Sequence, residues 1–278
     1  MRLFVACSLV FLCAACGGSS RAKLSENAPQ KAFAAGLGRL ETEPRATEIA
    51  RHVMTAKRPA ARRCVATRAL GGSKATYAAL VSRATLIRRA PTARSAVVSR
   101  IGTSDVNGFA QVLGVVGVHR GTSCRADWYR VQLPVLPNGT TGWIRPWAIK
   151  TFRVDTRIVV DLSARTLVVY RKNKPVMSTS VAVGAPSTPT PTGRFYVDER
   201  YVLPDASGPF GPYALGISAH SDALKSVWVQ DGPIGIHGTN EPSSIGHAAS
   251  HGCVRLENTL MRRLFPLAPA GTPVIVRA

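Results

Sequence analysis

Three of the six histidines lie within the fifteen residues from His237 to His251, and Cys253 follows two positions later. The third histidine of this group is His247, and glycines are interspersed among all four residues. A metal site would use the imidazoles and the thiolate as ligands, but the segment lacks the close cysteine pairs or the helical His and Glu spacing of common zinc sites. A cysteine nucleophile would instead use one imidazole as its base. The pattern favours a nucleophile without a metal or other cofactor.

Such a nucleophile needs a base within hydrogen-bond reach and N–H donors for an oxyanion. If residues 250–255 form a strand, His251 is separated from Cys253 by ~6.6 Å along that strand. A residue on an adjacent strand can lie closer, with Cβ atoms ~4.5 to 5.5 Å apart. His237 ends a short apolar run and is therefore the best candidate for the base. Gly252 leaves the backbone open, so that its N–H and that of Cys253 can face the oxyanion.

The elements that must position these residues are mostly strands. Short β-branched runs separated by turns predict a meander, further strands and one or two short helices in a C-terminal domain at residues 151–278. The meander is expected at 157–162, 166–170 and 176–183, further strands near 193–197, 226–230, 235–237 and 273–276, and a helix at 258–265. Asn258 is a suitable N-cap for that helix, with Leu260, Leu264 and Phe265 facing inward.

A second β-rich pattern precedes this domain, at residues 75–150. Its segment 128–144, with a turn at 137–139, resembles a small bacterial SH3-like barrel. Such domains bind cell-wall polymers or position a neighbouring enzyme, and the alternative is a purely structural spacer. Trp128, Trp143 and Trp147 suit either the core or a ligand-facing surface.

The N-terminus indicates export. Residues 3–15 are apolar and too short to span a bilayer, which is typical of a signal peptide at 1–15. Small residues precede Cys16 and a Gly/Ser run follows it, which resembles a lipobox with Cys16 as the lipidated residue. The alternative is simple cleavage and release. Residues 16–74 are rich in Ala, Arg and Pro, and are expected to form a partly disordered tether.

The remaining cysteines, Cys64 and Cys124, are candidates for a disulfide, because an exported protein lies in an oxidising space. Two unpaired buried thiols are the alternative.

The chain is strongly basic, with 36 Lys and Arg against 15 Asp and Glu and a formal net charge of +21. The charge is spread along the sequence rather than gathered in one block, which argues against a nucleic-acid partner. Distributed positive charge suits a protein that works beside anionic cell-wall polymers. An Arg enrichment that reflects only base composition is the alternative.

Residues 237–240, 244–246 and 250–256, in this order, resemble the signature of the L,D-transpeptidase (YkuD-like) catalytic domain family. The segments 183–184, 190–193 and 211–215 add to a likeness that covers residues 155–278. The resemblance implies a β-rich fold and an extracytoplasmic acyltransferase of the cell envelope, acting on peptidoglycan stem peptides.

The resemblance also implies roles for single residues. Cys253 attacks the carbonyl of the third residue of a donor tetrapeptide, usually meso-diaminopimelate, and expels D-Ala as a thioester forms. His237 is the base and is oriented by the carbonyl of Gly238. The N–H groups of Gly252 and Cys253 hold the oxyanion, and His251 and Ser250 support the pocket.

Two further residues are candidates for substrate binding. Arg255 suits a substrate carboxylate, because a guanidinium binds carboxylates bidentately, and a structural ion pair is its alternative. Tyr213 follows a Gly/Pro-rich segment at 208–211 and is assigned to a lid.

The acceptor is left open by the sequence. A side-chain amine of a second stem would form a 3→3 cross-link, and another amine or a protein could be attached in the same way. Water as acceptor would make the protein an L,D-carboxypeptidase. A non-catalytic wall-binding adaptor, anchored to the membrane through its lipid, is the remaining alternative.

Overall fold

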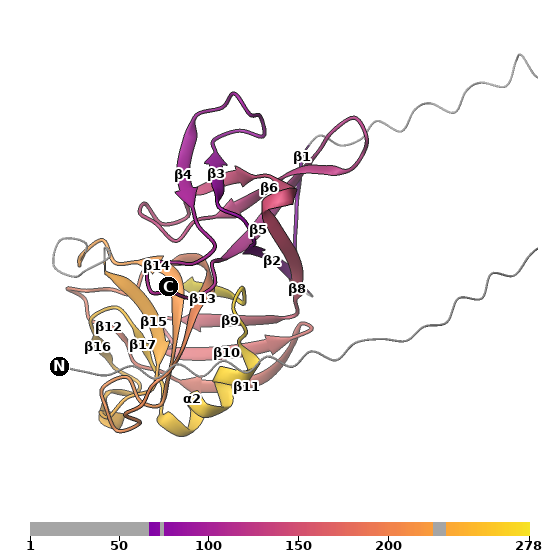
Figure 1. Cartoon of the computed structure of the whole chain (residues 1–278). Coiled ribbons are helices and arrows are strands. Elements are labelled where there is room, and N and C mark those ends of the chain that lie inside the picture. Colours follow the sequence, from indigo (N-terminus) through magenta and orange to yellow (C-terminus); the bar gives the residue numbers. More distant parts are fainter. Residues whose placement is uncertain (1–66, 73–74, 225–231) are drawn as a thin grey trace, which may run out of the picture. The chain divides into compact units, whose positions relative to one another are not determined.

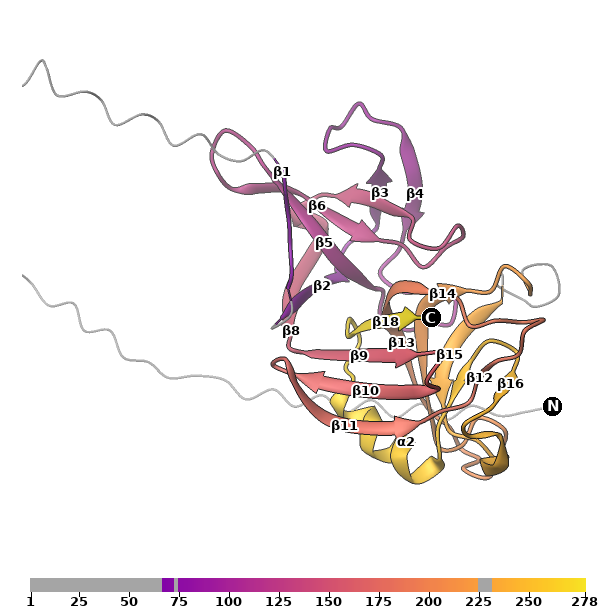
Figure 2. The same cartoon turned by 180° about the vertical axis from the view of Figure 1, so that it is seen from behind.

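The computed structural model describes residues 67–72, 75–224 and 232–278. The expected signal peptide, the lipidation site Cys16, most of the tether, Cys64 and the strand near 226–230 lie outside the described residues. Within them the chain is mostly β, as the sequence predicts, with two large sheets and one short α-helix. Figures 1 and 2 show these elements from opposite sides.

The first sheet has the strand order β4-β3-β7-β6-β5-β2-β8, with β1 paired to β5 (Figure 1). Its strands are β1 (Thr67–Ala69), β2 (Thr76–Val81), β3 (Thr85–Arg88), β4 (Val97–Ile101), β5 (Val112–Arg120), β6 (Ala126–Gln132), β7 (Thr141–Ile144) and β8 (Ile149–Val154), and the 3-10 helix η1 (Pro146–Ala148) precedes β8. The sheet therefore begins before residue 75 and ends at Val154. A likeness of this sheet to an SH3-like barrel stays a prediction.

The tryptophans of this region divide between interior and surface. Trp128 and Trp143 are buried, whereas Trp147 in η1 is exposed. Arg145 lies over the ring of Trp128, with its guanidinium carbon 4.1 Å from the ring centroid. Trp128 and Trp143 thus serve the core, whereas Trp147 offers an exposed aromatic surface.

The second sheet has the order β11-β10-β9-β18-β13-β14-β15-β17, and β12 and β16 form a separate parallel pair. The elements are β9 (Thr156–Asp161), β10 (Thr166–Arg171), β11 (Lys174–Ser180), β12 (Val183–Gly184), β13 (Gly193–Val202), β14 (Tyr213–His220), β15 (Pro233–His237), η3 (Pro242–Ser244), β16 (Ala248–Ser250), β17 (Val254–Arg255), α2 (Asn258–Leu264), η4 (Phe265–Leu267) and β18 (Pro273–Arg277).

The meander of β9, β10 and β11 confirms the predicted one, and its strands lie side by side in both views (Figures 1 and 2). Buried and half-buried residues alternate along β9, so that one face of the meander packs into the core. Ile158 and Val160 are fully buried, and Val159 between them is only half-buried. The last strand, β18, pairs with β9 in parallel, so that Val274 lies opposite Ile158. Burial of one face in this way fixes the register of the sheet.

Helix α2 contributes to the same core through Met261 and Leu264, as expected for Leu264. Its predicted N-cap was wrong, because Glu257 precedes the first helical residue and makes no side-chain cap. The Asn258 amide bonds outside the helix instead. Its Oδ1 accepts the Thr239 N–H at 2.9 Å, and its Nδ2 donates to the Ala206 carbonyl at 3.2 Å. Asn258 therefore ties together two loops that neighbour the histidine–cysteine cluster.

Residues 67–278, as far as they are described, belong to one compact unit, and polar contacts join its two sheets. Asn138 donates through Nδ2 to the His220 carbonyl at 2.7 Å and accepts the His220 N–H through Oδ1 at 2.9 Å. Gln132 donates to the Arg194 carbonyl at 2.7 Å. The turn predicted at 137–139 thus has a defined role, because its asparagine substitutes for a strand partner of β14.

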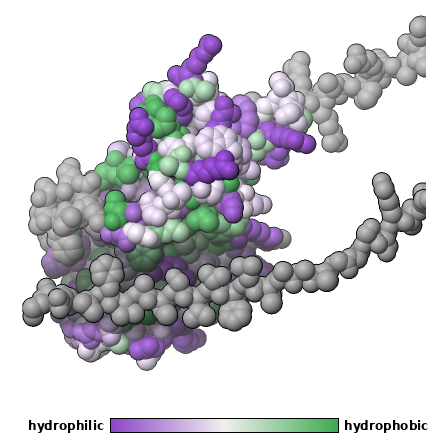
Figure 3. Space-filling model, viewed as in Figure 1, coloured by the Kyte–Doolittle hydropathy of each residue, from purple (hydrophilic) through white to green (hydrophobic). Residues whose placement is uncertain are grey.

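The surface mixes polar and apolar side chains. On the face in Figure 3, hydrophilic residues are dispersed over the described part rather than gathered in one block, in keeping with the spread of charge along the sequence. None of the helices in the described ranges has both the length and the apolar composition needed to cross a membrane.

Candidate active site

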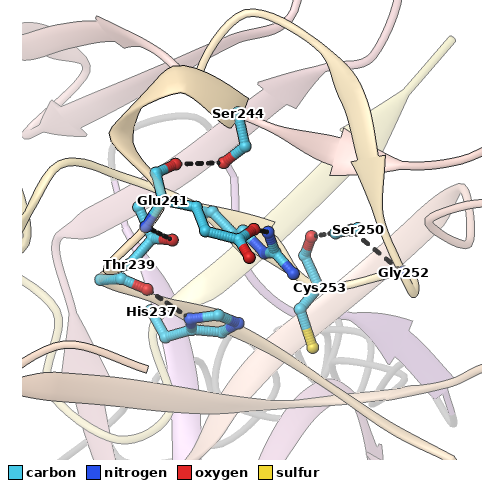
Figure 4. A network of polar contacts seen from close by, with 9 residues as sticks. His237, Thr239, Glu241, Ser244, Ser250, Gly252 and Cys253 are labelled. Atoms are coloured by element: carbon cyan, nitrogen blue, oxygen red, sulfur yellow. Dashed lines mark hydrogen bonds and ion pairs between the residues drawn. The ribbon is translucent and has the colours of Figure 1, made fainter. Parts of the chain in front are cut away.

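Strand pairing brings the predicted base and nucleophile together. β15 and β17 pair in parallel, with His237 opposite Arg255, and Cys253 immediately precedes β17. The Gly235 N–H, two residues before His237, donates to Cys253 Sγ at 3.4 Å. The side chains of His237 and Cys253 consequently share one face of the sheet, and Figure 4 shows both directed into the same space.

His237 is held as a neutral imidazole. Its side chain is only 3% exposed, and Nδ1 lies 2.5 Å from the Gly238 carbonyl oxygen. A carbonyl can only accept, so Nδ1 carries the proton and Nε2 keeps its lone pair. Burial lowers the pKa of His237 to about 4, the Gly238 carbonyl opposes this shift, and the charge of Arg255 adds to it. Near neutral pH the ring is therefore ready to accept a proton at Nε2.

Cys253 is a partly exposed, free thiol. Burial raises the pKa of this thiol, while the Gly235 N–H and the charge of Arg255 act in the opposite direction. Because the thiol pKa is raised and the His237 pKa is lowered, the resting pair consists of a neutral thiol and a neutral imidazole. A nucleophilic Cys253 in this state would transfer its proton to His237 during attack, rather than before it as in a preformed ion pair.

Residues 250–255 do not form one continuous strand. β16 ends at Ser250, β17 begins at Val254, and the three residues between them form a turn. Gly252 has φ +112° at this turn, and a Cβ there would lie 2.8 Å from Ile234 Cδ1. Only glycine avoids both the backbone strain and the clash. The turn leaves His251 exposed, whereas the cross-strand histidine, His237, is buried.

Ser250 closes the turn that carries the thiol. Its side chain is 2% exposed, and its Oγ accepts the Gly252 N–H at 3.1 Å and donates to the Cys253 carbonyl at 2.5 Å. These bonds appear as dashed lines in Figure 4. The Gly252 N–H, expected to face the oxyanion, thus already has an acceptor. The Cys253 N–H has no hydrogen-bond acceptor in the described part of the chain, and it is the donor that remains available for an oxyanion.

A loop between β12 and β13 braces this turn from the other side. Thr188 donates through Oγ1 to the Ser250 carbonyl at 3.1 Å, and Thr190 donates through Oγ1 to the Gly252 carbonyl at 2.8 Å. The Gly184 N–H donates to Thr190 Oγ1 at 2.9 Å. A Cβ on Gly184 would lie 2.4 Å from the Thr188 carbonyl oxygen, so this approach requires glycine. Sequence reasoning noted segments 183–184 and 190–193 but assigned them no role.

Arg255 is engaged in an ion pair. Its Nη1 donates to Glu241 Oε2 at 2.8 Å, and the side chains of Arg255 and Glu241 are 18% and 65% exposed. Arg255 Nε is buried and finds no acceptor among the residues described. The guanidinium is close enough to influence the pKa values of both His237 and Cys253. The structural ion pair considered from the sequence is therefore present in the resting site.

The remaining candidates lie at the edge of the site. The Tyr213 carbonyl accepts the Gly238 N–H at 3.3 Å, while its ring stacks on Phe265 with centroids 4.5 Å apart. Phe210, from the Gly/Pro-rich segment, instead contacts the His237 ring edge-on at 4.9 Å. Phe210 is thus a site residue that sequence reasoning missed, and its only signal was its place beside Gly211.

Two further questions raised by the sequence are the disulfide and a metal site. Cys124 is disulfide-bonded, and its predicted partner Cys64 is outside the described residues, so that pairing stays a prediction. No group of three or more His, Cys, Asp or Glu side chains that could hold a metal ion occurs in the described ranges.

Replacing Ser250 by alanine is expected to weaken both the fold and the site. The change leaves the Gly252 N–H and the Cys253 carbonyl without their buried partner, at a cost of about 1 to 3 kcal/mol in the free energy of unfolding. Urea unfolding measures this loss, and Ser250→Thr, which keeps the hydroxyl, is the matched control. An alanine variant as stable as the wild type would show that the hydroxyl does not hold the turn.

The segment that holds this site is similar in sequence to known proteins. Residues 155–276 match the family model YkuD, described as the L,D-transpeptidase catalytic domain. A relative from Bacillus licheniformis named as an L,D-transpeptidase, YkuD, is 40% identical over 123 residues, which cover 44% of this chain and 66% of that protein. A Bacillus subtilis relative of the same name is 37% identical over 125 residues, covering 45% and 68%.

Among solved structures, the catalytic domain of the E. faecium L,D-transpeptidase is 26% identical and covers 44% of this chain and 97% of that one, with a TM-score of 0.33. The chain spans about two thirds of the length of the two Bacillus relatives. The matched segment runs from β9 into β18 and contains every residue of the histidine–cysteine cluster. Through residues 155–276, the chain belongs to the L,D-transpeptidase (YkuD) catalytic domain family.

Proposed function

We propose that this protein is a cysteine-dependent peptidoglycan L,D-transpeptidase that forms 3→3 cross-links through a thioester on Cys253. The observation that carries the proposal is the pairing of β15 with β17, which sets a neutral His237 and a neutral thiol on one face of the sheet. Family membership supports the substrate class, since an L,D-transpeptidase acts on stem peptides of peptidoglycan.

In the acylation step, Cys253 Sγ attacks the carbonyl carbon of the third residue of the donor stem, and its proton passes to His237 Nε2. Negative charge develops on the carbonyl oxygen, where the Cys253 N–H can donate. Collapse of this intermediate breaks the bond to D-Ala, and His237 returns the proton to the leaving amine. D-Ala departs as a neutral amine, and the stem remains as a thioester.

In the second step, a side-chain amine of another stem attacks the thioester carbonyl. His237 Nε2 takes a proton from the attacking nitrogen and returns it to the departing Cys253 sulfur, which restores the neutral thiol. One amide bond has then replaced another, so the step needs no energy source outside the donor. In this mechanism Arg255 binds a free carboxylate of the substrate, and Tyr213 belongs to a lid over the site.

We further propose that the protein acts outside the cytoplasm, anchored to the membrane by a lipid on Cys16. The apolar segment 3–15 and the small residues before Cys16 support export and lipidation. The basic composition favours attraction to anionic wall polymers, and the first sheet would present the enzyme to them.

Incubating the protein without its signal peptide with disaccharide-tetrapeptide is expected to yield a dimer that has lost one D-Ala, identified by mass. Adding a chelator leaves this activity intact, whereas iodoacetamide abolishes it. Tripeptide without dimer would identify water as the acceptor and a carboxypeptidase. An unchanged tetrapeptide would refute the proposed function.

A further inference from the structure

We propose that Glu241 is an internal carboxylate that occupies Arg255 in the empty site and yields it to a free carboxylate of the substrate. Glu241 would thereby act as a specificity residue that lowers the apparent affinity for donors relying on Arg255. This inference rests on the proposed function and concerns the same site. The ligand class is a free carboxylate on one of the two residues joined by the scissile bond.

The position of Arg255 makes it a substrate-facing residue rather than a remote surface cation. It lies opposite His237 in the β15–β17 register and two residues beyond Cys253, and its charge affects the pKa values of both. A carboxylate that approaches Cys253 on a donor stem therefore meets this guanidinium. Glu241 is the residue that already occupies it.

The backbone of Glu241 is fixed, so only its side chain would have to move. The Glu241 N–H donates to Thr239 Oγ1 at 3.0 Å, and its carbonyl accepts from Ser244 Oγ at 2.7 Å. Figure 4 shows the Glu241 side chain extending from this anchored turn toward the segment that carries Cys253. Release of Arg255 thus requires rotation about side-chain bonds and no change in the turn.

The ion pair is incompletely formed. Glu241 contacts Arg255 through Nη1, while Nε is buried without an acceptor. A guanidinium binds a carboxylate best through two parallel N–H bonds, and the contact with Glu241 supplies one. A substrate carboxylate that engages two N–H groups of Arg255 would hold it more strongly than Glu241 does.

Separating Glu241 from Arg255 also costs the Glu241 carboxylate little solvation free energy. Its side chain is 65% exposed, so water can solvate the carboxylate as soon as it leaves Arg255. The exchange replaces one carboxylate by another beside the guanidinium. The charge that acts on His237 and Cys253 is therefore preserved while the donor binds, and the neutral resting pair is not disturbed.

The two residues joined by the scissile bond of a donor tetrapeptide carry two free carboxylates. One ends the side chain of the diamino acid whose carbonyl is attacked, and the other belongs to the terminal D-Ala. Both bind a guanidinium by the same chemistry. Donors amidated at one or the other position distinguish them.

The test compares steady-state release of the terminal residue by the wild type and Glu241→Gln, using the unmodified donor and the two amidated donors. We expect Glu241→Gln to lower KM for the unmodified donor about two- to fivefold, the range that an exposed ion pair supports, with kcat unchanged. The gain should vanish with the donor whose recognised carboxylate is amidated and persist with the other. Glu257→Gln removes the same charge from an exposed position two residues beyond Arg255 and should leave KM unchanged.

A merely structural role for Glu241 predicts the opposite sign, because losing the ion pair would then disorder Arg255 and raise KM. An unchanged or raised KM in a folded Glu241→Gln protein overturns the inference, as does an equal gain with both amidated donors. Glu241→Asp is a second variant, since it keeps the charge but shortens the reach, and it should lower KM in the same direction.

Binding of the donors to Cys253→Ala, with and without Glu241→Gln, separates this inference from the proposed function. If the wild type releases no D-Ala, the proposed function fails. Tighter binding of the unmodified donor to the double variant would still support the role of Glu241. Equal binding to both proteins would refute it.

Discussion

Replacing Cys253 by alanine is expected to lower the rate of D-Ala release at least about 10³-fold, because the thioester can no longer form. Among the described residues, Cys253 is the free thiol, and it lies on the face of the sheet that carries His237. The remaining polar groups of the site can bind a stem peptide but offer no comparable nucleophile. The loss should therefore appear in kcat, with donor binding largely retained.

Intact-mass spectrometry measures the same step directly. The wild type should gain the mass of the acyl group when mixed with donor in the absence of an amine acceptor, and also when exposed to a carbapenem, whereas Cys253→Ala should gain neither. Cys253→Ser is the matched control, because an oxygen can still accept the Gly235 N–H while being a much weaker nucleophile. The two variants should unfold at similar urea concentrations.

Full activity of a correctly folded Cys253→Ala protein would refute the mechanism as a whole. A mass increase on this variant would show that acylation occurs at another residue. Either result would leave the histidine–cysteine cluster without the proposed chemistry.

The strand pattern and the position of His237 on the strand beside the Cys253 segment could be predicted from the sequence, because both depend on local periodicity and on general sheet geometry. The meander follows from alternating β-branched residues, of which Ile158 and Val160 face the core. His237 ranks above His251 because a cross-strand neighbour can approach a side chain more closely than a residue two positions along the same strand. The turn at residues 251–253 interrupts the strand but leaves this argument for His237 unchanged, since β15 and β17 still pair.

The hydrogen bonds that hold the site could not be predicted in the same way. Thr190 and Gly252 are 62 residues apart, and Asn258 and Ala206 are 52 apart. Nothing in the local sequence around Thr190 indicates which carbonyl its hydroxyl will reach. Asn258 looked like a helix cap because capping is a local rule, but a distant N–H competed successfully for its side chain.

The partner of Arg255 posed a similar problem. A guanidinium binds a carboxylate of the substrate and a carboxylate of the protein by the same hydrogen bonds, so the sequence did not decide which of them binds Arg255. Only the fold of the turn after His237 decides that Glu241 reaches it.

Replacing His237 by glutamine is expected to slow acylation of Cys253 by about 10² to 10⁴-fold at pH 7, the usual contribution of a general base. Glutamine has a similar reach and can still donate to the Gly238 carbonyl, but its amide cannot accept the thiol proton at neutral pH. His247→Gln is the matched control. It makes the same change at an exposed histidine six residues from Cys253, and it should leave acylation within about twofold of the wild type.

The pH dependence distinguishes loss of the base from mere distortion. The reactive form of His237 is neutral, and burial lowers its pKa to about 4, so wild-type acylation should stay constant as pH falls through 6.5 and decline only near pH 4. Without the base, only the thiolate fraction reacts. Since burial raises the thiol pKa, the rate of His237→Gln should climb about tenfold per pH unit through neutral pH. Rapid mixing with donor at pH 4 to 9 measures both profiles.

A wild-type profile that declines around pH 6.5 would mean that the imidazole is solvated during catalysis and that the buried state does not act. A flat profile for His237→Gln would mean that the thiol loses its proton to another group. The two slopes thus test separately the two protonation states from which the mechanism starts, a neutral ring and a neutral thiol. Both states follow from burial of the same face of the sheet.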